Sequence, residues 1–578
     1  NNNVAGQLQP VTGNSLVQLG GGDYSGVSAS NTVNNTLDQN VTITDSYLNL
    51  AGINSAPNVD ENNTVTGNVT ANGNSQVNFF ASNGTNVINT IDGQVALNDA
   101  SILTAVDGSA GGNGNVVVGG INLNGTGSVS VGTGESTSNV TRDNSLNGDI
   151  HFNNHNSSVL IGEVINNTNV GSTDAITNTH FGTIDTTTAG EGGIVQLAST
   201  VTGNNNSVTN VSNIQNGAVT LDGANSNLWL NGSTNLQSTS SATINNDLNG
   251  AVALTDGGNV SLTGSQTNSG TGSSVINNTI TGNVDVTDAT VSLSQGSASG
   301  SGATDTTNKI DGNATLNSSS HLFLTGDDDS TDNHDASNTI TGTTTLNNNS
   351  TALATGVNNA INNGLIVNNS STAVVGGSSD TTINSRDIAN SLNADVTTNG
   401  HDANLFIGAF GGNTNITNGN DITNTLTGTV TMNGGLVTLG GADRFPSSPS
   451  WGNNLANGDS VTNQITGNVN VHSGLTPNAS RLELGGDSFA NTGNTGTVNN
   501  IITGNVTVDG DSYVGIWGNY DPEDGSNTVN NTIGGSLTAD NNSFIRISGN
   551  DNTVTGGVTL NGFAQALIAD HTHSGTIP

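Results

Sequence analysis

A run of aspartates at residues 327–329, followed by Asp332 and Asp335, is the densest group of side chains that could do chemistry. Convergent carboxylates can hydrolyse a glycosidic bond, and carboxylate oxygens are preferred ligands of Ca²⁺. Aspartate is also common in solvated loops, because its side chain hydrogen-bonds nearby backbone groups. We interpret the run as a loop between repeats, with a Ca²⁺ site as the alternative.

Other sequences that suggest chemistry are isolated. The Gly-Gly-Asp sequences at 21–23 and 485–487, and the related 440–443, look like fragments of the calcium-binding nonapeptide repeat. They are not tandem, so we interpret them as turns. The nine histidines show no metal-ligand spacing, and the only bases are Lys309 and five scattered arginines, which suits a polysaccharide lyase poorly. We predict no cofactor, no metal and no catalytic residue, and a polysaccharide lyase or hydrolase is the alternative.

Composition limits both the fold and the partners. The 578 residues include 79 Gly, no Cys, and 44 Asp and Glu against 6 Lys and Arg, and only 3% are aromatic. Binding to nucleic acid or to anionic lipid needs many basic side chains, so a net charge of −38 argues against both partners. So few bulky side chains cannot build a conventional core, but a solenoid can bury a small set repeatedly.

The two ends of the chain lead to further expectations. The first three residues are polar and no apolar run is long enough for a transmembrane helix, so a secreted protein would already have lost its targeting segment. The tail with His571, His573 and Pro578 is too short to cap a solenoid alone. We therefore expect the natural polypeptide to continue beyond Pro578.

A repeat of about 30 residues runs through the chain. Its consensus is N-x-[IVL]-x-G-x-[VIL]-x-[VL], as at residues 278–286, 463–471 and 500–508, and a second alternating segment closes each copy. Eighteen copies align on the glycine position, which is occupied by Gln39 and Ala394 in two of them. Alternate residues of a strand share a face, so we expect the asparagine, the aliphatic residues and the glycine to point inward.

The asparagine four residues before the glycine is present in every copy except one, which has Ala360. An inward asparagine at a fixed position of each coil can bond the asparagine of the next coil, which satisfies polar atoms that burial would otherwise isolate. We therefore predict a structural ladder of stacked amides. Its members are Asn35, Asn63, Asn89, Asn115, Asn144, Asn178, Asn213, Asn246, Asn278, Asn308, Asn338, Asn390, Asn424, Asn463, Asn500, Asn531 and Asn552.

These features predict an all-β fold, a single parallel β-helix of about 18 coils. Residues 1–30 would form an N-terminal coil or cap, residues 31–560 the repeats, and residues 561–578 the end of the last coil and a tail, in one structural domain overall. A β-propeller would show Trp-Asp or aromatic-Gly signatures in each blade, which are absent. A disordered array would not require the strict alternation of apolar and polar residues seen here, so we do not favour it.

Aromatic and arginine side chains give the candidate binding positions. Trp229, Phe323, Phe406 and Arg546 each stand between two inward aliphatic residues and should point outward. The insertion at 440–459 and a loop two coils later carry further residues of the kind that anchor interfaces. The candidate binding residues are Arg444, Phe445, Trp451, Trp517, Tyr520, Trp229, Phe323 and Phe406. Packing of the loops on themselves, and neutral single aromatics, are the alternatives.

The repeats at 278–284 and 63–69, Asn-Thr-Ile-Thr-Gly-Asn-Val and Asn-Thr-Val-Thr-Gly-Asn-Val, resemble passenger domains of type V autotransporter adhesins of Gram-negative bacteria. The likeness is greatest to the diffuse-adherence and self-associating group. It covers essentially the whole chain, but it is a likeness of repeat style, not of an active-site motif. It implies a virulence-associated, right-handed parallel β-helix passenger at the bacterial cell surface or secreted, and the family's membrane barrel and serine-protease module are not seen here.

The resemblance implies adhesion to host cells and extracellular matrix, or cell–cell aggregation and biofilm formation. The expected partners are matrix proteins such as fibronectin, collagen or laminin, glycans, or another copy of the chain on a neighbouring cell, without direct membrane insertion of this segment. The negative charge argues against heparin-like ligands by long-range attraction. We therefore expect an adhesin that is not an enzyme, and the choice between self-association and host adhesion stays open.

Overall fold

The computed structural model describes residues 2–5, 8–20, 31–53, 59–82, 86–108, 113–132, 135–136, 141–153, 156–162, 164–166, 173–186, 192–202, 207–237, 239–268, 271–300, 303–326, 334–376, 382–384, 387–408, 415–417, 421–440, 460–473, 480–485, 496–517 and 528–570. Every helix or strand within these ranges is a β-strand. Strands of successive coils pair in parallel, so the predicted all-β, parallel β-helix is confirmed. Its right-handedness stays a prediction.

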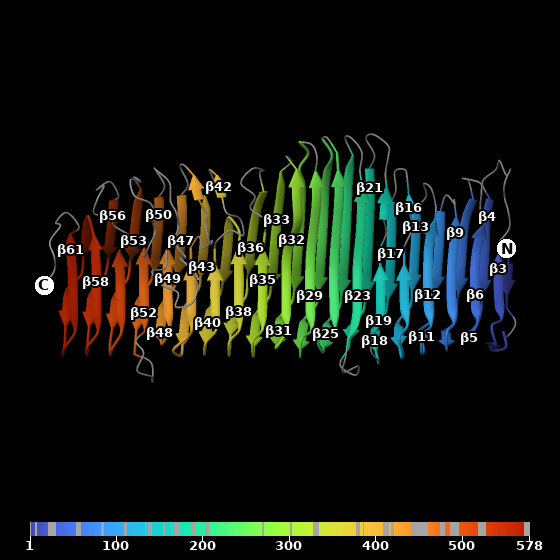
Figure 1. Ribbon diagram of the computed structural model, residues 1–578, viewed down its shortest axis with the longest axis horizontal. Coiled ribbons are helices and arrows are strands. Elements are labelled where there is room, and N and C mark those ends of the chain that lie inside the picture. Colours follow the sequence, from blue (N-terminus) through green and yellow to red (C-terminus); the bar gives the residue numbers. More distant parts are fainter. Residues whose placement is uncertain are drawn as a thin grey trace. The chain divides into compact units, whose positions relative to one another are not determined.

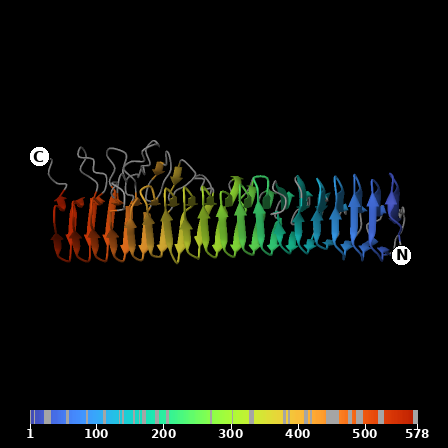
Figure 2. The ribbon, with the colours of Figure 1, turned by 90° about the horizontal axis from the view of Figure 1, so that it is seen from below.

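The chain divides into two compact units, Asn1–Thr304 (unit 1) and Asp305–Pro578 (unit 2). In each unit a coil supplies strands to three sheets, A, B and C, and the strands of successive coils lie side by side in chain order (Figures 1 and 2). Both units are built from the same coil. The prediction that they form one structural domain stays a prediction.

The strands of unit 1 form three groups. Sheet A contains β1 (Asn2–Val4), β4 (Asn31–Leu37), β7 (Val59–Val65), β10 (Asn86–Ile91), β13 (Asn113–Val118), β17 (Thr141–Asn147), β21 (Thr173–Phe181), β24 (Val208–Asn216), β27 (Ser241–Asn249) and β30 (Ser274–Thr281). Sheet B contains β2 (Val11–Thr12), β5 (Val41–Thr44), β8 (Val69–Asn72), β11 (Val95–Leu97), β14 (Ile121–Leu123), β18 (Ile150–Phe152), β22 (Ile184–Asp185), β25 (Val219–Asp222), β28 (Val252–Thr255) and β31 (Val284–Thr287). Sheet C contains β3 (Leu16–Gly20), β6 (Tyr47–Ile53), β9 (Gln76–Ser82), β12 (Ile102–Gly108), β15 (Ser128–Val131), β16 (Glu135–Ser136), β19 (Ser157–Ile161), β20 (Val164–Asn166), β23 (Gly193–Thr202), β26 (Asn227–Leu236), β29 (Asn259–Asn268) and β32 (Thr290–Gly300).

Unit 2 repeats the arrangement. Sheet A contains β33 (Thr304–Asp311), β36 (His334–Ile340), β39 (Asn358–Asn362), β43 (Ile388–Asn393), β47 (Asp421–Thr427), β50 (Ser460–Thr466), β53 (Thr497–Ile502), β56 (Thr528–Ile533) and β59 (Asp551–Val554). Sheet B contains β34 (Ala314–Asn317), β37 (Thr344–Leu346), β40 (Leu365–Asn368), β44 (Val396–Asn399), β48 (Val430–Asn433), β51 (Val469–Val471), β54 (Val506–Val508), β57 (Leu537–Ala539) and β60 (Val558–Leu560). Sheet C contains β35 (His321–Thr325), β38 (Thr351–Thr355), β41 (Thr372–Val375), β45 (Asn404–Ile407), β49 (Leu436–Gly440), β52 (Arg481–Gly485), β55 (Tyr513–Trp517), β58 (Phe544–Gly549) and β61 (Gln565–Asp570), and β42 (Thr382–Asn384) pairs with β46 (Asn415–Thr417) outside the three sheets.

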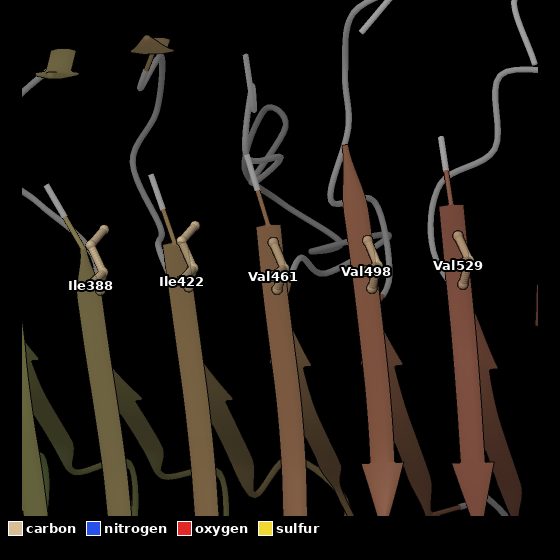
Figure 3. Packing of buried hydrophobic residues seen from close by; sticks show 5 residues of the cluster. All are labelled: Ile388, Ile422, Val461, Val498 and Val529. Carbon is tan, nitrogen blue, oxygen red and sulfur yellow. The ribbon is translucent and has the colours of Figure 1, made fainter. Parts of the chain in front are cut away.

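The core consists of aliphatic rows that run from coil to coil. In β50, Val461, Asn463 and Ile465 are fully buried, whereas Thr462 and Gln464 between them face outward, as the period of a strand requires. Two residues before each ladder asparagine of β43, β47, β50, β53 and β56, aliphatic side chains stack into one such row (Figure 3). This row contains Ile388, Ile422, Val461, Val498 and Val529. Each buried aliphatic side chain contributes about 1.5–3 kcal/mol to the stability of the fold. Many such side chains, repeated from coil to coil, can therefore stabilise the protein without bulky aromatic residues.

The repeat's glycine lies in the turn between sheets A and B, not on the inward face of a strand as expected. A Cβ at Gly282 would lie 2.5 Å from the carbonyl oxygen of Gly250, and one at Gly504 would lie 2.2 Å from that of Gly467. Turns of successive coils therefore stack too closely for a side chain. Gly467 also has φ +156°, which few residues other than glycine adopt.

The first coil lies before the first copy counted in the sequence. Asn2 pairs in register with Asn35, and its Nδ2 donates to Asn35 Oδ1 at 2.9 Å. Residues 2–6 match the consensus, with Asn2 and Gly6 at the asparagine and glycine positions. Counting from Gln39 therefore left out one coil.

The copy with Ala360 does not interrupt the ladder, because its alignment on Gly364 was wrong by one residue. Asn359 is the residue that pairs with Asn338 and Asn390. The turn position that glycine occupies elsewhere is taken by Asn363, whose φ is +72°. Asparagine tolerates this left-handed conformation better than other residues with a side chain, so it replaces the glycine there.

The predicted ladder position of Asn115 is wrong. Asn115 pairs in register with Ile88 and Asp143, and Val116 occupies the ladder position between Asn89 and Asn144. The cause is a shorter turn: two residues separate Val118 from Ile121, whereas three separate Ile91 from Val95 in the preceding coil. Because side chains alternate, the slip of one residue exchanges the two faces of the strand.

Candidate functional site

The asparagine ladder is a buried hydrogen-bonded chain. In unit 2 each Nδ2 donates to Oδ1 of the next asparagine at 2.7–2.9 Å, through Asn308, Asn338, Asn359, Asn390, Asn424, Asn463, Asn500, Asn531 and Asn552. In unit 1 the same bonds join Asn2, Asn35, Asn63 and Asn89, and then Asn144, Asn178, Asn213, Asn246 and Asn278. The break lies at β13, where Asn89 Nδ2 has no acceptor among the described residues.

Many ladder amides also bond across the core. Asn338 Nδ2 donates to the carbonyl oxygen of Thr355 at 2.7 Å, and Asn531 Nδ2 donates to that of Ser548 at 3.1 Å. Each acceptor lies in sheet C of the same coil, so one side chain ties sheet A to sheet C and to the next coil. Only an amide offers two donors and an acceptor at this length. The ladder is therefore structural.

Two further hydrogen-bonded ladders were not predicted from the sequence. The residue after the turn glycine is often Asn or Asp, and its side-chain oxygen accepts the next coil's backbone N–H, as Asn468 does from Asn505 at 2.9 Å. A buried serine precedes many sheet C strands, and Ser371 Oγ accepts from the backbone N–H of Ser350 at 3.2 Å. Both patterns are visible as Asn or Asp after the turn glycine and as Ser before the second alternating segment.

Titratable side chains replace some aliphatic residues in the inward rows of unit 1, among them His180 and Glu61. His180 Nε2 lies 2.8 Å from the carbonyl oxygen of Gly148, and Nδ1 lies 2.5 Å from Gln215 Oε1. Burial lowers the pKa of His180. Glu61 is fully buried, and burial raises its pKa to about 7. Neither side chain is exposed, so neither offers a surface site.

The outward face of sheet C in unit 2 is unusual for so polar a chain. One row of residues in register from coil to coil runs along it: Phe323, Leu353, Val374, Phe406, Thr438, Glu483, Gly515, Arg546 and Leu567. Its first four residues are apolar and its later part is charged. Outward apolar side chains in a continuous row are typical of an interaction surface.

The later part of this face forms a cluster that we call the platform. It consists of Arg481, Glu483, Tyr513, Gly515, Trp517, Phe544 and Arg546. β52, β55 and β58 hold these residues in register, with Arg481 beside Tyr513 and Tyr513 beside Phe544. Two of the chain's five arginines and three of its few aromatics meet here.

Ring and cation contacts join the platform side chains. The Tyr513 and Phe544 rings stack with centroids 5.8 Å apart and planes 22° apart. The Arg481 guanidinium lies 5.1 Å from the Tyr513 centroid, and that of Arg546 lies 5.4 Å from the Trp517 ring. Cations are attracted to the negative faces of aromatic rings, so the arginines hold the rings in place.

Gly515 leaves room for the side chains of its strand-mates Tyr513 and Trp517 to lean over it. A Cβ at Gly515 would lie 2.8 Å from Tyr513 Cε1 and Oη and 3.0 Å from Trp517 Nε1. The edges of both rings therefore cover the glycine, which is itself buried.

Glu483 supplies the negative charge of the platform. Its side chain is 3% exposed, and Arg481 Nε donates to Glu483 Oε1 at 2.5 Å. The Arg481 side chain is 46% exposed. The ion pair leaves Arg481 accessible at the edge of the platform, with Glu483 beneath it.

No match to the chain was found among protein-family models, curated proteins or solved structures.

The candidate binding residues from the sequence fall into three groups. Trp517 is the last residue of β55, paired in register with Ser548, and not part of the loop in which we placed it. Trp229 and Phe323 are half-buried at outward positions, and Phe323 stacks on the His321 ring with centroids 5.7 Å apart. Arg444, Phe445, Trp451 and Tyr520 lie outside the described residues.

Phe406 was expected to be exposed and is 3% exposed. Its outward position between the inward Leu405 and Ile407 is as predicted. Alternation fixes the direction of a side chain, but not what packs over it. Thr438, the next residue of the same outward row, is also fully buried.

The structure describes little of the acidic run that the sequence offers as a candidate catalytic or Ca²⁺ site. Of the acidic run, only Asp335 lies within the described residues, where it is exposed in β36. Over the described ranges, no three His, Cys, Asp or Glu side chains gather as a metal site would require. No helix long and apolar enough to cross a membrane occurs in those ranges either. The polysaccharide-enzyme alternative, which rests on residues 327–329, stays a prediction.

Proposed function

We propose that this chain is an extracellular adhesin, the passenger of a type V autotransporter, and that it binds its target through the platform on sheet C of unit 2. The observation that carries the proposal is the clustering of Tyr513, Trp517, Phe544 and two arginines on one outward face of a chain with 3% aromatic residues. Aromatic and arginine side chains dominate the binding energy of protein surfaces. A parallel β-helix also suits this role, because its paired backbone holds the cluster rigid.

The test uses the whole 578-residue chain, displayed on cells that lack other adhesins or coupled to beads. We expect adherence to cultured host cells or matrix-coated surfaces, and we expect Tyr513→Ala and Trp517→Ala to reduce it about tenfold or more. The matched control is Trp229→Ala, which removes an outward tryptophan of sheet C in unit 1 among the polar residues Gln196 and Ser261.

The outcome separates a binding site from a general loss of structure. Circular dichroism melts should be the same for all three variants within a few degrees, because the substituted side chains lie outside the core. Equal adherence of the wild type, Trp517→Ala and Trp229→Ala would remove the platform from the proposal.

Self-association is a second candidate, supported by the outward amide ladders on sheet B. In unit 2, Asn317, Asn347, Asn368, Asn399 and Asn433 bond in series at 2.7–2.9 Å. A regular polar row can multiply weak contacts between two copies. Aggregation of beads that carry only this chain, with no host protein present, tests self-association. Beads that stay dispersed at millimolar salt concentrations and below would reject it.

A further inference from the structure

We propose that the coil built from β13, β14 and β15 is an opening point of unit 1, at which the coils from β4 to β12 detach as one block from the coils that begin with β17. We call this coil the seam. The inference concerns how the scaffold opens, so it holds whether or not the platform binds a target. The interactions that join neighbouring coils weaken at the seam in three ways.

The asparagine ladder is interrupted at the seam. Val116 stands in register between Asn89 and Asn144, so neither asparagine has an amide neighbour on that side. On the far side of each, Asn63 Nδ2 donates to Asn89 Oδ1 and Asn144 Nδ2 donates to Asn178 Oδ1, both at 2.9 Å. The Asn89 Nδ2 group is buried without an acceptor among the described residues, which opposes the stacking of the seam on the coil before it.

Backbone pairing in sheet C becomes shorter at the same place. β12 pairs with β9 along Ile102–Gly108, but with β15 only along Ile102–Ala105. β15 in turn pairs with β19 along Ser128–Val131, whereas two later strands, β23 and β26, pair along Ile194–Thr202. Because each coil of a solenoid contacts only its neighbours, shorter pairing at one interface weakens the coupling between everything on its two sides.

One inward row of sheet A is disrupted around the seam. Its members in register are Val33, Glu61, Val87, Gly114, Arg142 and Ile176. The seam supplies the glycine, and a buried glutamate and a buried arginine lie on either side of it. The two carboxyl oxygens of Glu61 have no hydrogen-bond partner among the described residues. Later coils fill the same row with aliphatic residues, namely Ile176, Val211, Ile244 and Ile276. The row therefore packs less favourably around the seam than beyond it.

These features set the size of the block that opens. A stack of coils unfolds locally in cooperative groups, and the boundary of a group lies at the weakest interface between coils. Residues 31–108 lie before the seam, so we expect their coils to open together. Beyond the seam the ladder is continuous from Asn144 to Asn278, which holds the later coils of unit 1 in place.

The block contains Glu61, so its opening depends on pH. Burial raises the pKa of Glu61 from 4.5 to about 7. The neighbouring strands β4, β6, β9 and β10 contain no charged residue and no histidine, and Asp60 in β7 alternates to the outer side of the sheet. Opening exposes the carboxyl to water, which favours its ionised form. Opening is therefore least favourable below about pH 4.5 and becomes more favourable as pH rises to about 7.

The experiment uses the full chain, which has no cysteine, so that a single introduced cysteine reports the exposure of one buried position. Val65→Cys and Val95→Cys place the reporter in two coils of the block, and Val211→Cys places it beyond the seam, all at fully buried valines. The rate of thiol labelling, divided by the rate in the unfolded chain at the same pH, gives the equilibrium constant for opening. We expect equal constants at residues 65 and 95, and a constant at least tenfold smaller at residue 211.

The decisive variant is Val116→Asn, which returns an amide to the ladder position of the seam. We expect an opening constant about tenfold smaller at both reporters of the block, because the new side chain can accept from Asn89 Nδ2, and an unchanged constant beyond the seam. The matched control is Val117→Asn, the same change one residue further along β13, in register with the outward Thr90. It should leave all three constants unchanged.

The pH dependence supplies a test that leaves the seam unchanged. Between pH 5 and pH 8 the opening constant at residue 65 should rise at least tenfold, and it should stay nearly level when Glu61→Val is added.

Equal opening constants at the three reporters would overturn the proposal, because unit 1 would then open as a whole. Constants that Val116→Asn leaves unchanged, or that Val117→Asn lowers equally, would also overturn it. Circular dichroism melts show whether each variant folds. If Val116→Asn failed to fold, the three reporters in the otherwise unchanged chain would still decide whether the block opens first.

Discussion

The outward row of sheet C differs between the two units, although the inward rows are alike. In unit 1 the row is almost entirely polar: Gln18, Asn49, Asn78, Thr104, Ser130, Leu160, Gln196, Trp229, Ser261 and Ser292. In unit 2 it begins with Phe323, Leu353, Val374 and Phe406 and continues into the platform. On both sides of each row, inward residues such as Leu228 and Leu482 are fully buried.

The difference shows where this fold permits specialisation. Packing dictates the inward residues, because each must fill the same space as the residues of neighbouring coils. Outward residues face no such demand, so a coil can exchange Ser261 for Glu483 or Arg546 without altering the scaffold. An outward row that departs from Asn, Ser and Thr therefore indicates function more strongly than any inward feature.

The first prediction converts the platform into a face like that of unit 1. The triple variant Tyr513→Asn, Trp517→Ser and Phe544→Ser should reduce adherence at least about a hundredfold, the largest effect we expect, because it removes every ring of the platform. Stability should change by only about 1 kcal/mol, since the rings lie outside the core. Cell adherence and urea unfolding are the two measurements. Adherence equal to that of the wild type would contradict the role given to the unit 2 face.

The second prediction concerns an inward row in which unit 2 carries mostly aliphatic residues, such as Ile422 and Val461. Glu61 occupies this row in unit 1 between Val33 and Val87, and burial raises its pKa to about 7. The folded state holds the proton more tightly than the unfolded state, so the contribution of Glu61 to stability should be greatest below about pH 4.5 and fall as pH rises to about 7. The loss is on the order of 2 to 3 kcal/mol.

Glu61→Val should remove that pH dependence, and Glu61→Gln separates the charge from the polarity of the side chain. Thermal unfolding between pH 4 and pH 9 is the measurement, with the wild type as reference. The wild type should melt lower at pH 8 than at pH 5 by a margin that both variants lose. A variant that keeps the wild-type slope would show that another group titrates.

The third prediction compares the continuous ladder with its break. Asn463→Ala in unit 2 removes bonds to Asn424 and Asn500 and leaves their buried groups without partners, which should cost about 2 kcal/mol. Asn89→Ala in unit 1 removes only the bond from Asn63, because the Asn89 amide nitrogen has no acceptor within the described ranges, and should cost about 1 kcal/mol. Equal losses of unfolding free energy in the two variants, measured with denaturant, would contradict the conclusion that the ladder is interrupted after Asn89.

The ladder could be predicted because burial at a fixed phase leaves an asparagine few alternatives to bonding its own copy. The two errors arose in the turn. Alignment on Gly364 missed Asn359, because Asn363 takes the left-handed conformation that glycine usually takes. The slip at Asn115 came from a turn shorter by one residue, and no local pattern in the strand reveals it.

The platform was foreseeable only in part. The alternating segments that contain Glu483 and Arg546 were recognised, and Trp517 was a candidate, but they were not aligned with Tyr513 and Phe544. Alignment of the sheet C strands by their inward leucines and isoleucines would have placed all of them on one face. The burial of Phe406 could not be read in this way, because it depends on what packs above the sheet.

The sequence by itself determined the coil: its period, its alternating strands, its inward aliphatic rows and its stacked amides, because strand alternation and the cost of buried polar groups act locally and repeat. Only the tertiary structure decided the register between coils, and with it which outward residues meet. Tyr513, Trp517 and the two arginines become one surface because parallel pairing places residues about 30 apart in the chain side by side, and because the glycine between the two rings leaves room for their edges.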